Sequence, residues 1–370
     1  MKITRYILPL LAVMAATASC DRDSNSGPDE PVHTGNLDFD VMTTSGADTT
    51  GTVTTENIPD FRAYAYKTEG NREIIMDGAY VHRTGKNSWV YDDPVKWPDT
   101  PVNIEAVYPV SYKISVSQWD FWSSVQYNVT RTVDGKQVSA ADQDLCVAVR
   151  RDATRDEGII RLNFRHCMAR VQLDIAADIP LTTVVVKGID LYDVAGSGTF
   201  MLPKESTTDR TDTDQFKNCW YHHLSNRYQI VPYFQSGDGQ EVPLTTVPAR
   251  LCTGNNYFYI PIPFEPVKEN NGYIVGTAIR VLCKLIRTED GQRIWPNQFT
   301  PYQLLGPGGL NSGYAYIYFP LLDERLDHSE WLSGYDYHYT VRILKQGTLP
   351  TSGDTRGERK NELSVKVSEY

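Results

Sequence analysis

The chain has 370 residues and a formal net charge of −10, from 46 acidic and 36 basic residues. This negative balance argues against nucleic acid or an anionic lipid surface as a partner, because both favour positive charge. A hydrophobic content of 41% is ample for globular cores, and 23 tyrosines favour strands over helices.

The first twenty residues direct the chain out of the cytoplasm. Lys2 and Arg5 precede an apolar run from Ile7 to Ala16, and small residues lead into Cys20. An apolar run of about ten residues is too short to span a bilayer, so residues 1–19 are predicted to be a cleaved signal peptide. Small residues followed directly by a cysteine resemble the lipobox of bacterial lipoproteins, which implies that Cys20 is lipidated. Ordinary secretion with an incidental cysteine is the alternative.

The residues after Cys20 have the composition of a spacer. Residues 20–35 hold Asp, Ser, Gly, Pro and Asn without an apolar pattern, so they cannot bury enough surface to offset their ordering entropy. Asp21 and Asp23 resemble the acidic signal that sends lipoproteins of Bacteroidetes to the cell surface. We therefore expect a lipid anchor in the outer membrane that holds the protein on the cell surface, with a periplasm-facing location as the alternative.

Period-two alternation of apolar and polar residues dominates the rest of the chain, and helical periodicity is nearly absent. Each alternating segment offers one face to a core and one to water, as antiparallel sandwiches do. The sequence therefore predicts an all-β fold. The apolar positions of five such segments are Leu37, Phe39 and Val41; Ile160, Leu162 and Phe164; Val171, Leu173 and Ile175; Tyr337, Tyr339, Val341 and Ile343; and Leu363, Val365 and Val367.

The length after the spacer predicts two domains, because about 335 residues exceed what one core usually serves. A charged run between Arg150 and Gly158 separates two strand-like segments and suggests domains at residues 36–158 and 159–370. The alternative interpretation of this run is a long hairpin loop inside one domain.

Five cysteines follow Cys20, and their spacings contain no close pair of the kind that binds zinc. We therefore predict no metal site and no cofactor. A disulfide between Cys146 and Cys167 is one interpretation, because both lie in strand-like segments outside the cytoplasm. Buried free thiols are the other.

Catalytic motifs do not stand out, and we expect no enzyme. His166 has no second ligand at metal spacing, so a hydrogen-bonded structural role is expected. His222 and His223 are neighbours, and neighbouring residues of a strand point to opposite faces, so we do not expect the two histidines to chelate one metal ion. The glycine-rich run at 306–313 lacks the lysine and hydroxyl residue of a phosphate loop.

Several segments, in order along the chain, resemble the fimbrillin family of Bacteroidetes, which comprises subunits and accessory proteins of type V pili. The resemblance implies two antiparallel, transthyretin-like β-sandwich domains and association with other pilus subunits, with adhesion to a host protein or glycan as a further partner class. The segments are FRAYAY at 61–66, VKWPDTPVNIEAVYP at 95–109, ADQDLCVAV at 141–149, LNFRHCMARVQLDI at 162–175, VVVKGIDLYDVAGSGTFML at 184–202, WLSGYDYHYTVRI at 331–343 and NELSVKV at 361–367.

The resemblance further implies assembly by strand exchange, in which a protease removes the first strand and a neighbour's strand fills the groove. Leu37, Phe39 and Val41 are then the groove-filling residues, and the donor strand carries Leu363, Val365 and Val367. No arginine or lysine stands between Arg22 and Arg62, so a trypsin-like protease has no site just after the first strand. This favours an anchor or accessory subunit over a shaft subunit, although shaft and tip roles stay open.

A surface lipoprotein that captures glycans is the alternative function, because exposed aromatic rings stack on sugars. Four tryptophans could supply such platforms, although core burial is the commoner fate of an aromatic residue in a sandwich. They are Trp119, Trp122, Trp295 and Trp331.

Overall fold

The computed structural model describes residues 35–43, 57–68, 72–85, 88–117, 122–133, 136–139, 143–208, 216–221, 229–237, 240–252, 258–348 and 361–369. The expected signal peptide, Cys20 and the spacer up to residue 34 lie outside these residues. Among the described residues, no helix has the length and apolar character needed to cross a membrane.

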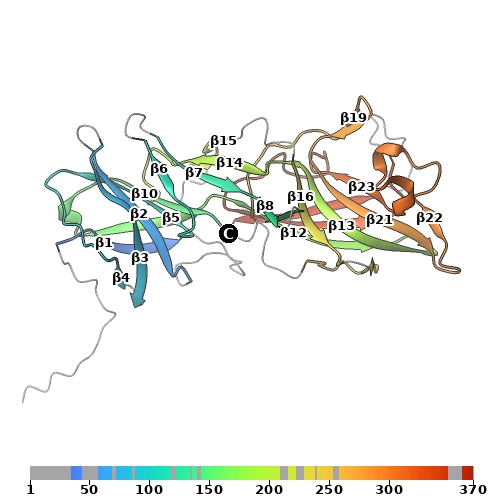
Figure 1. Cartoon of the computed structure of the whole chain (residues 1–370), viewed down its shortest axis with the longest axis horizontal. Coiled ribbons are helices and arrows are strands. Elements are labelled where there is room, and N and C mark those ends of the chain that lie inside the picture. The colour runs from blue at the N-terminus through green and yellow to red at the C-terminus, as the bar shows by residue number, and fades with distance from the viewer. Residues whose placement is uncertain are drawn as a thin grey trace, which may run out of the picture.

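The fold is all-β, as the alternation predicts, and its sheets follow one another along an elongated molecule (Figure 1). One end is a seven-stranded sheet in which β1 occupies one edge. Its strands, in spatial order, are β1 (Asp38–Thr43), β11 (Ile159–His166), β10 (Cys146–Ala153), β5 (Val102–Tyr108), β2 (Asp60–Lys67), β3 (Ile74–Gly85) and β4 (Ser88–Val90).

A four-stranded sheet in the middle of the molecule joins the two halves of the sequence. Strand β7 pairs antiparallel with β14, although some seventy residues separate them along the chain. The order is β15 (Trp220–Tyr221), β14 (Ser197–Met201), β7 (Ser123–Asn128) and β6 (Ile114–Val116). A two-stranded ribbon formed by β8 (Thr130–Val133) and β9 (Lys136–Ser139) follows β7 along the chain.

Two further sheets form the other end of the molecule. The first has the order β16 (Gln229–Gln235), β13 (Thr182–Val194), β21 (Ala278–Arg287) and β22 (Arg293–Trp295), with β17 (Val242–Pro243) on β13 and β23 (Ala315–Pro320) on β21. The second has the order β18 (Phe258–Tyr259), β12 (Ala169–Ala177), β24 (Tyr335–Ile343) and β25 (Glu362–Glu369).

Short elements complete the described part of this end. A small hairpin pairs β19 (Lys268–Asn270) with β20 (Tyr273–Val275), and its turn places Asn271 and Gly272 at positive φ. Asn-Gly is the sequence that tolerates such a turn best. This end also contains the 3-10 helices η4 (Tyr302–Leu304) and η5 (Gly309–Ser312), whereas η1 (Arg155–Glu157) lies between β10 and β11 at the first end.

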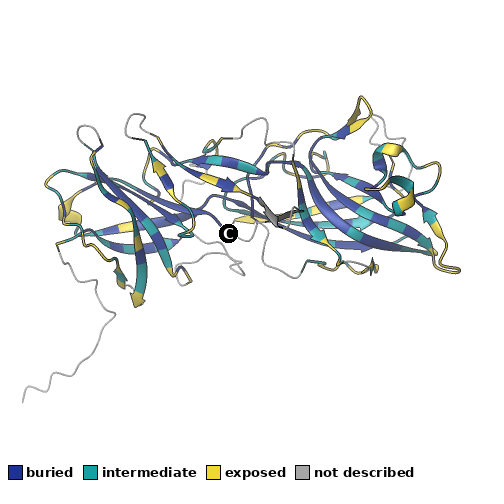
Figure 2. Ribbon diagram, viewed as in Figure 1, coloured by how far each residue is buried: buried dark blue, intermediate teal, exposed yellow. Residues whose placement is uncertain are grey.

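Two hydrophobic clusters fill the interior. The smaller cluster lies within the seven-stranded sheet and includes the apolar face of β1. The larger cluster draws on both ends: Tyr64, Val107 and Val147 of the first sheet belong to it together with the apolar residues of β12 and β24. Buried positions accordingly occur in the strands at both ends and in those that join them (Figure 2). The two halves of the molecule therefore share one of their cores.

The pairing of the strands adds detail to two sequence-based expectations. The predicted boundary at residues 158/159 cuts off β11 from its own sheet, because β11 pairs with β1 and with β10. The charged run contains η1 and forms the connection between β10 and β11, which is the hairpin alternative. The sheets are also not purely antiparallel, since β1 pairs parallel with β11 and β12 pairs parallel with β24.

Candidate functional site

The first candidate assembly element is β1 together with Leu37, the residue that precedes it, because Leu37, Phe39 and Val41 all belong to the smaller core. Leu37, Phe39 and Val41 are buried, and the ring of Phe39 packs edge-on against Phe61 at 5.9 Å between centroids. Tyr91 packs against Phe39 from the other side at 5.9 Å. Burying three such side chains contributes roughly 5–9 kcal/mol before ordering costs. The structure therefore places the three predicted residues together in one filled groove.

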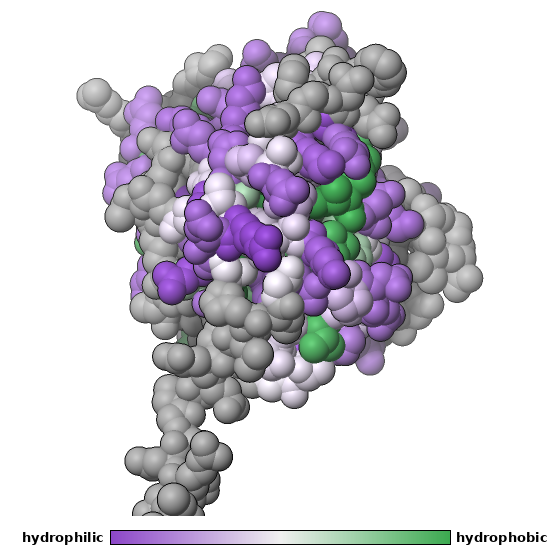
Figure 3. Space-filling model, turned by 90° about the vertical axis from the view of Figure 1, so that its left-hand side faces the viewer, coloured by the Kyte–Doolittle hydropathy of each residue, from purple (hydrophilic) through white to green (hydrophobic). Residues whose placement is uncertain are grey.

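Backbone contacts hold β1 on both of its sides. Along one side it runs parallel to β11, with Phe39 beside Ile160 and Val41 beside Leu162. At its start, the amide of Leu37 donates to the carbonyl of Val95 at 2.8 Å, and the Tyr91 hydroxyl donates to the carbonyl of Leu37 at 3.1 Å. The end of the molecule that carries this sheet shows mainly hydrophilic side chains (Figure 3).

The first arginine after β1 lies inside the sheet. Arg62 is in β2, where its backbone pairs with Tyr80 of β3 on one side and with Val107 of β5 on the other. Its guanidinium donates to the carbonyl of Val110 at 2.7 Å and to the carbonyl of Gly78 at 3.0 Å. A protease needs an extended, unpaired segment, so the bond that follows Arg62 is closed to cleavage in the folded protein.

The second candidate element is β25, an edge strand that is held less firmly than β1. It pairs antiparallel with β24 over eight positions, from Tyr335 opposite Glu369 to Arg342 opposite Glu362. Burial fades along it: Leu363 is 8% exposed, Val365 is half-buried and Val367 is 45% exposed. The predicted donor residues therefore share one face of a strand, but only the first of them is buried.

A hollow of about 630 Å³ lies beside this face of β25. Its walls combine the apolar residues of β25 with Tyr335 and Tyr337 of β24 and with the segment 325–332. His328 of that segment stacks on Tyr337 at 5.3 Å, and its Nε2 lies 2.6 Å from the Tyr339 hydroxyl. Desolvation lowers the pKa of His328 below its usual value. The strand therefore covers an incompletely filled groove.

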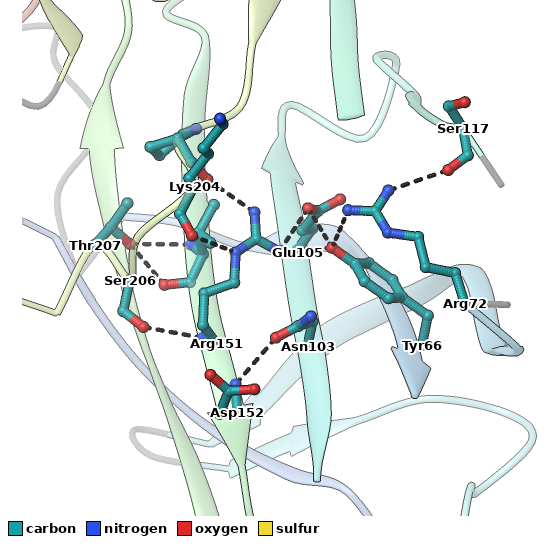
Figure 4. A network of polar contacts seen from close by, with 12 residues as sticks. Tyr66, Arg72, Asn103, Glu105, Ser117, Arg151, Asp152, Lys204, Ser206 and Thr207 are labelled. Carbon is teal, nitrogen blue, oxygen red and sulfur yellow. Dashed lines mark hydrogen bonds and ion pairs between the residues drawn. The ribbon is translucent and has the colours of Figure 1, made fainter. Parts of the chain in front are cut away.

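A buried polar network braces the sheet that carries β1 (Figure 4). Arg151 of β10 donates to the buried carboxylate of Glu105 at 2.7 Å, to the Tyr66 hydroxyl at 2.6 Å and to the carbonyl of Pro203 at 2.8 Å. Arg72 donates to the same Tyr66 hydroxyl at 3.3 Å. Burial raises the pKa of Tyr66 far above its usual value, so this hydroxyl keeps its proton. The network ties β2, β5 and β10 to the segment after β14.

That segment enters the sheet at Thr207, which is fully buried between β10 and β11. The amide of Thr207 donates to the carbonyl of Val149 at 2.8 Å, and its hydroxyl donates to the carbonyl of Asn163 at 2.7 Å. The amide of Val149 donates to the same hydroxyl at 3.0 Å. The β10–β11 ladder accordingly covers only the first two residues of β10. No sequence pattern predicts this insertion, because Thr207 stands in a polar run between strands.

The tryptophans give the glycan alternative little support. Trp295 and Trp331 are among the most deeply buried large side chains, so neither can serve as an exposed platform. Trp122 is 46% exposed, and Lys204 Nζ lies over its ring at 4.6 Å. Trp119 lies outside the described residues.

The cysteines do not form the expected disulfide, because Cys146 and Cys167 are both buried thiols in the structure. Cys146 stands opposite His166, the neighbour of Cys167, in the β10–β11 ladder. Since neighbouring residues point to opposite faces, Cys146 enters the smaller core and Cys167 the larger one. Burial raises the pKa of both thiols.

Comparison with known proteins identifies one protein family that the sequence matches and solved structures that the fold resembles. A family model described as fimbrillin-like matches residues 34–278. The chain is similar to a crystal structure of a fimbrial protein from Bacteroides vulgatus ATCC 8482, with a TM-score of 0.52 at 12% identity over 90% of this chain and 99% of that chain. Among curated proteins, none matches the chain.

Two structures from Porphyromonas gingivalis are similar at lower scores. A fimbrilin (FimA) from strain W83 gives a TM-score of 0.46 at 10% identity, over 92% of this chain and 99% of that one. The tip fimbrial protein Mfa3, solved with a C-terminal truncation, gives 0.35 at 12% identity, over 90% and 99%.

Proposed function

Because the chain belongs to the fimbrillin-like family, we propose that it is a structural subunit of a surface pilus that keeps its lipid and its first strand and so serves as an anchor or accessory subunit. The protein is then tethered to the outer membrane through Cys20 and faces outward. Its partners are other pilus subunits.

The observation that carries the anchor role is the absence of a cleavage site next to β1. No arginine or lysine occurs between Arg22 and Arg62, and Arg62 is paired on both sides within the sheet. A subunit that retains β1 has a filled groove and cannot accept a neighbour's strand there. It can still donate a strand of its own, and such a subunit terminates a fibre rather than extending it.

The strand proposed for donation is β25. Its apolar face covers the hollow only in part, so β25 loses less buried surface on leaving than β1 does. A donated strand that adds to the sheet edge of a neighbour gains affinity from main-chain hydrogen bonds and specificity from the side chains at alternate positions. Leu363, Val365 and Val367 supply that alternation.

The mature N-terminus tests this proposal. Mass spectrometry of protein extracted from native membranes is expected to find a lipid-modified Cys20 and peptides from residues 21–60. The matched control is Thr50→Arg, which places a cleavage site in the connection between β1 and β2. Limited digestion with trypsin should cut this variant after residue 50 and leave the bond after Arg62 intact in both proteins. A native N-terminus at Ala63 would overturn the anchor role.

Strand donation is tested separately, with co-expressed pilus subunits. On blots probed for this chain, deleting residues 361–370 should abolish the SDS-resistant ladder that it forms with the other subunits, while Lys366→Ala, on the polar face of β25, should preserve it. A ladder that persists after the deletion would exclude β25 as the donor without affecting the anchor role.

A further inference from the structure

Three buried side chains with metal-ligating atoms meet where β10 begins and β11 ends. Cys146 is the first residue of β10 and His166 is the last residue of β11, and the two are partners in the ladder. Asp144 lies two residues before Cys146. His166 Nδ1 is 2.6 Å from Asp144 Oδ2 and 3.5 Å from Cys146 Sγ. The ligating atoms of all three residues lie within 4.8 Å of one another.

This arrangement does not suit nucleophilic catalysis. A thiol relay uses one imidazole nitrogen for the thiol and the other for the carboxylate. Here both groups approach the same nitrogen, Nδ1. The site is also closed to a substrate, because Asp144 and His166 are each 4% exposed and Cys146 is 1% exposed.

The spacing does suit a small divalent cation. A tetrahedral zinc ion with bonds of about 2.3 Å to sulfur and about 2.0 Å to nitrogen holds these two atoms roughly 3.5 Å apart. Cys146 Sγ and His166 Nδ1 are 3.5 Å apart without any rearrangement. The contact of 2.6 Å between Nδ1 and the Asp144 carboxylate needs to widen by roughly 0.7 Å to admit the ion.

Asp144 supplies a second, independent indication. Its Oδ1 is buried and has no hydrogen-bond partner within the part of the chain that the structure describes. A buried polar atom without a partner costs free energy, and a cation would satisfy it. This carboxylate therefore has a second oxygen available for coordination.

We propose that Asp144, Cys146 and His166 form a structural site for one Zn²⁺ ion, in which Asp144 contributes both carboxylate oxygens. The four donor atoms are then Cys146 Sγ, His166 Nδ1 and the two oxygens of Asp144. Binding releases the thiol proton of Cys146 to solvent, and the proton that His166 Nδ1 shares with the Asp144 carboxylate moves to Nε2. The thiolate, the carboxylate and the neutral imidazole together then balance the double positive charge. A site without net charge is compatible with burial. Within the described residues, no other Asp, Glu, His or Cys belongs to this group.

The site would fasten β10 to β11 at the point where they are still paired. Beyond Val147 the two strands separate around Thr207, and β11 carries β1 on its other edge. A metal ion here would stabilise the strand on which β1 rests. This proposal does not depend on the pilus role.

The test is metal content after refolding, because a buried site is loaded as the chain folds. The full mature chain is unfolded with chelator, refolded with equimolar Zn²⁺ or Co²⁺, and separated from unbound metal by gel filtration. Elemental analysis should find one metal ion per chain. The Co²⁺ form should show thiolate-to-cobalt charge-transfer absorption together with the intense visible bands of a four-coordinate cobalt ion.

Cys146→Ser should lower the amount of bound metal at least about tenfold. Replacing a residue that only orients a metal ligand can already weaken metal binding by this factor, and Cys146 is proposed to be a ligand itself. The matched control is Cys283→Ser, which alters another fully buried thiol and should retain the ion. Equal metal content in the two variants, or a refolded wild-type chain that holds no metal, would overturn the site and leave a hydrogen-bonded trio only. If Cys146→Ser fails to fold, the Co²⁺ spectrum of the wild-type chain decides alone, because the charge-transfer band requires a thiolate ligand.

Discussion

Removing the ring of Phe39 should release β1 from its sheet without unfolding the rest of the protein. The Phe39 side chain is almost fully buried between Phe61 and Tyr91. Replacing a buried phenylalanine with alanine costs about 3–5 kcal/mol, as transfer free energy plus a cavity. Because β1 is an edge strand, we expect this cost to appear first as local opening of β1.

Hydrogen exchange measures this opening directly. Since each 1.4 kcal/mol changes an equilibrium tenfold, a cost of about 3–5 kcal/mol in Phe39→Ala should speed exchange of the β1 amides by roughly 10²- to 4 × 10³-fold. The matched control is Asp40→Ala on the opposite face of the strand, which should change stability by less than about 0.5 kcal/mol. Less than tenfold acceleration in Phe39→Ala, or equal acceleration in both variants, would refute the assignment of β1 as a strand held by its apolar face.

Three further predictions concern interactions inside the fold. Thr207→Val should lower the free energy of unfolding in urea by about 1–3 kcal/mol, because it leaves the buried backbone groups of Val149 and Asn163 without their hydroxyl partner. The control is Thr84→Val at an exposed position, and an equal decrease in stability in the two variants would contradict the prediction. Glu105→Gln should lower the free energy of unfolding by about 3–5 kcal/mol, because it breaks a buried ion pair with Arg151. Glu73→Gln, in an exposed pair, should lower it by only about 0–1 kcal/mol. Similar losses in the two variants would contradict the role of burial. Burial lowers the pKa of His328 in the folded protein, so as pH falls the imidazole takes up a proton in the unfolded chain first. The contribution of the neutral His328 to the free energy of unfolding is therefore complete above the usual histidine pKa of about 6.5 and is lost as pH falls below it. The melting temperature should therefore fall less between pH 7.5 and pH 5 in His328→Gln than in the wild type, and equal slopes would contradict the prediction.

The strands were predictable because alternation reports which side of a strand faces a core. The alternating residues at 160–164, 171–175 and 337–343 lie in β11, β12 and β24 with their apolar side buried. The ordered motifs also predicted the family, which the match over residues 34–278 confirms. Both kinds of signal are local, since each resides in the residues of one segment.

Strand partners were not predictable, because alternation is the same for any neighbour. Nothing in residues 37–43 shows that they pair in parallel with a strand more than a hundred residues later. For the same reason the sequence could not show that β11 pairs with β1 and β10 across the expected boundary at 158/159. The burial of Trp295 and Trp331 likewise depends on which sheets pack over them, so the residue type alone could not distinguish a core ring from a sugar platform.

The trio at the start of β10 shows how register decides chemistry. Asp144 and Cys146 are only two residues apart in sequence, but His166 joins them only because β11 returns with His166 opposite Cys146. A hairpin centred on the charged run was one of the two interpretations of that run. Counting back along its two strands would have brought His166 close to Cys146, although the exact register depends on the length of the turn.

The two terminal strands differ in a way that matters for assembly. A strand can be exchanged only if the chain loses little by releasing it and a neighbour gains much by accepting it. Strand β1 and the preceding Leu37 bury three apolar side chains and are held at their start by Val95 and Tyr91, so their release is costly. Strand β25 exposes half of its apolar face beside an open hollow, and the chain ends where the two groups of sheets meet (Figure 1). This asymmetry supports the proposal that β25 is the strand to be donated and that β1 is retained.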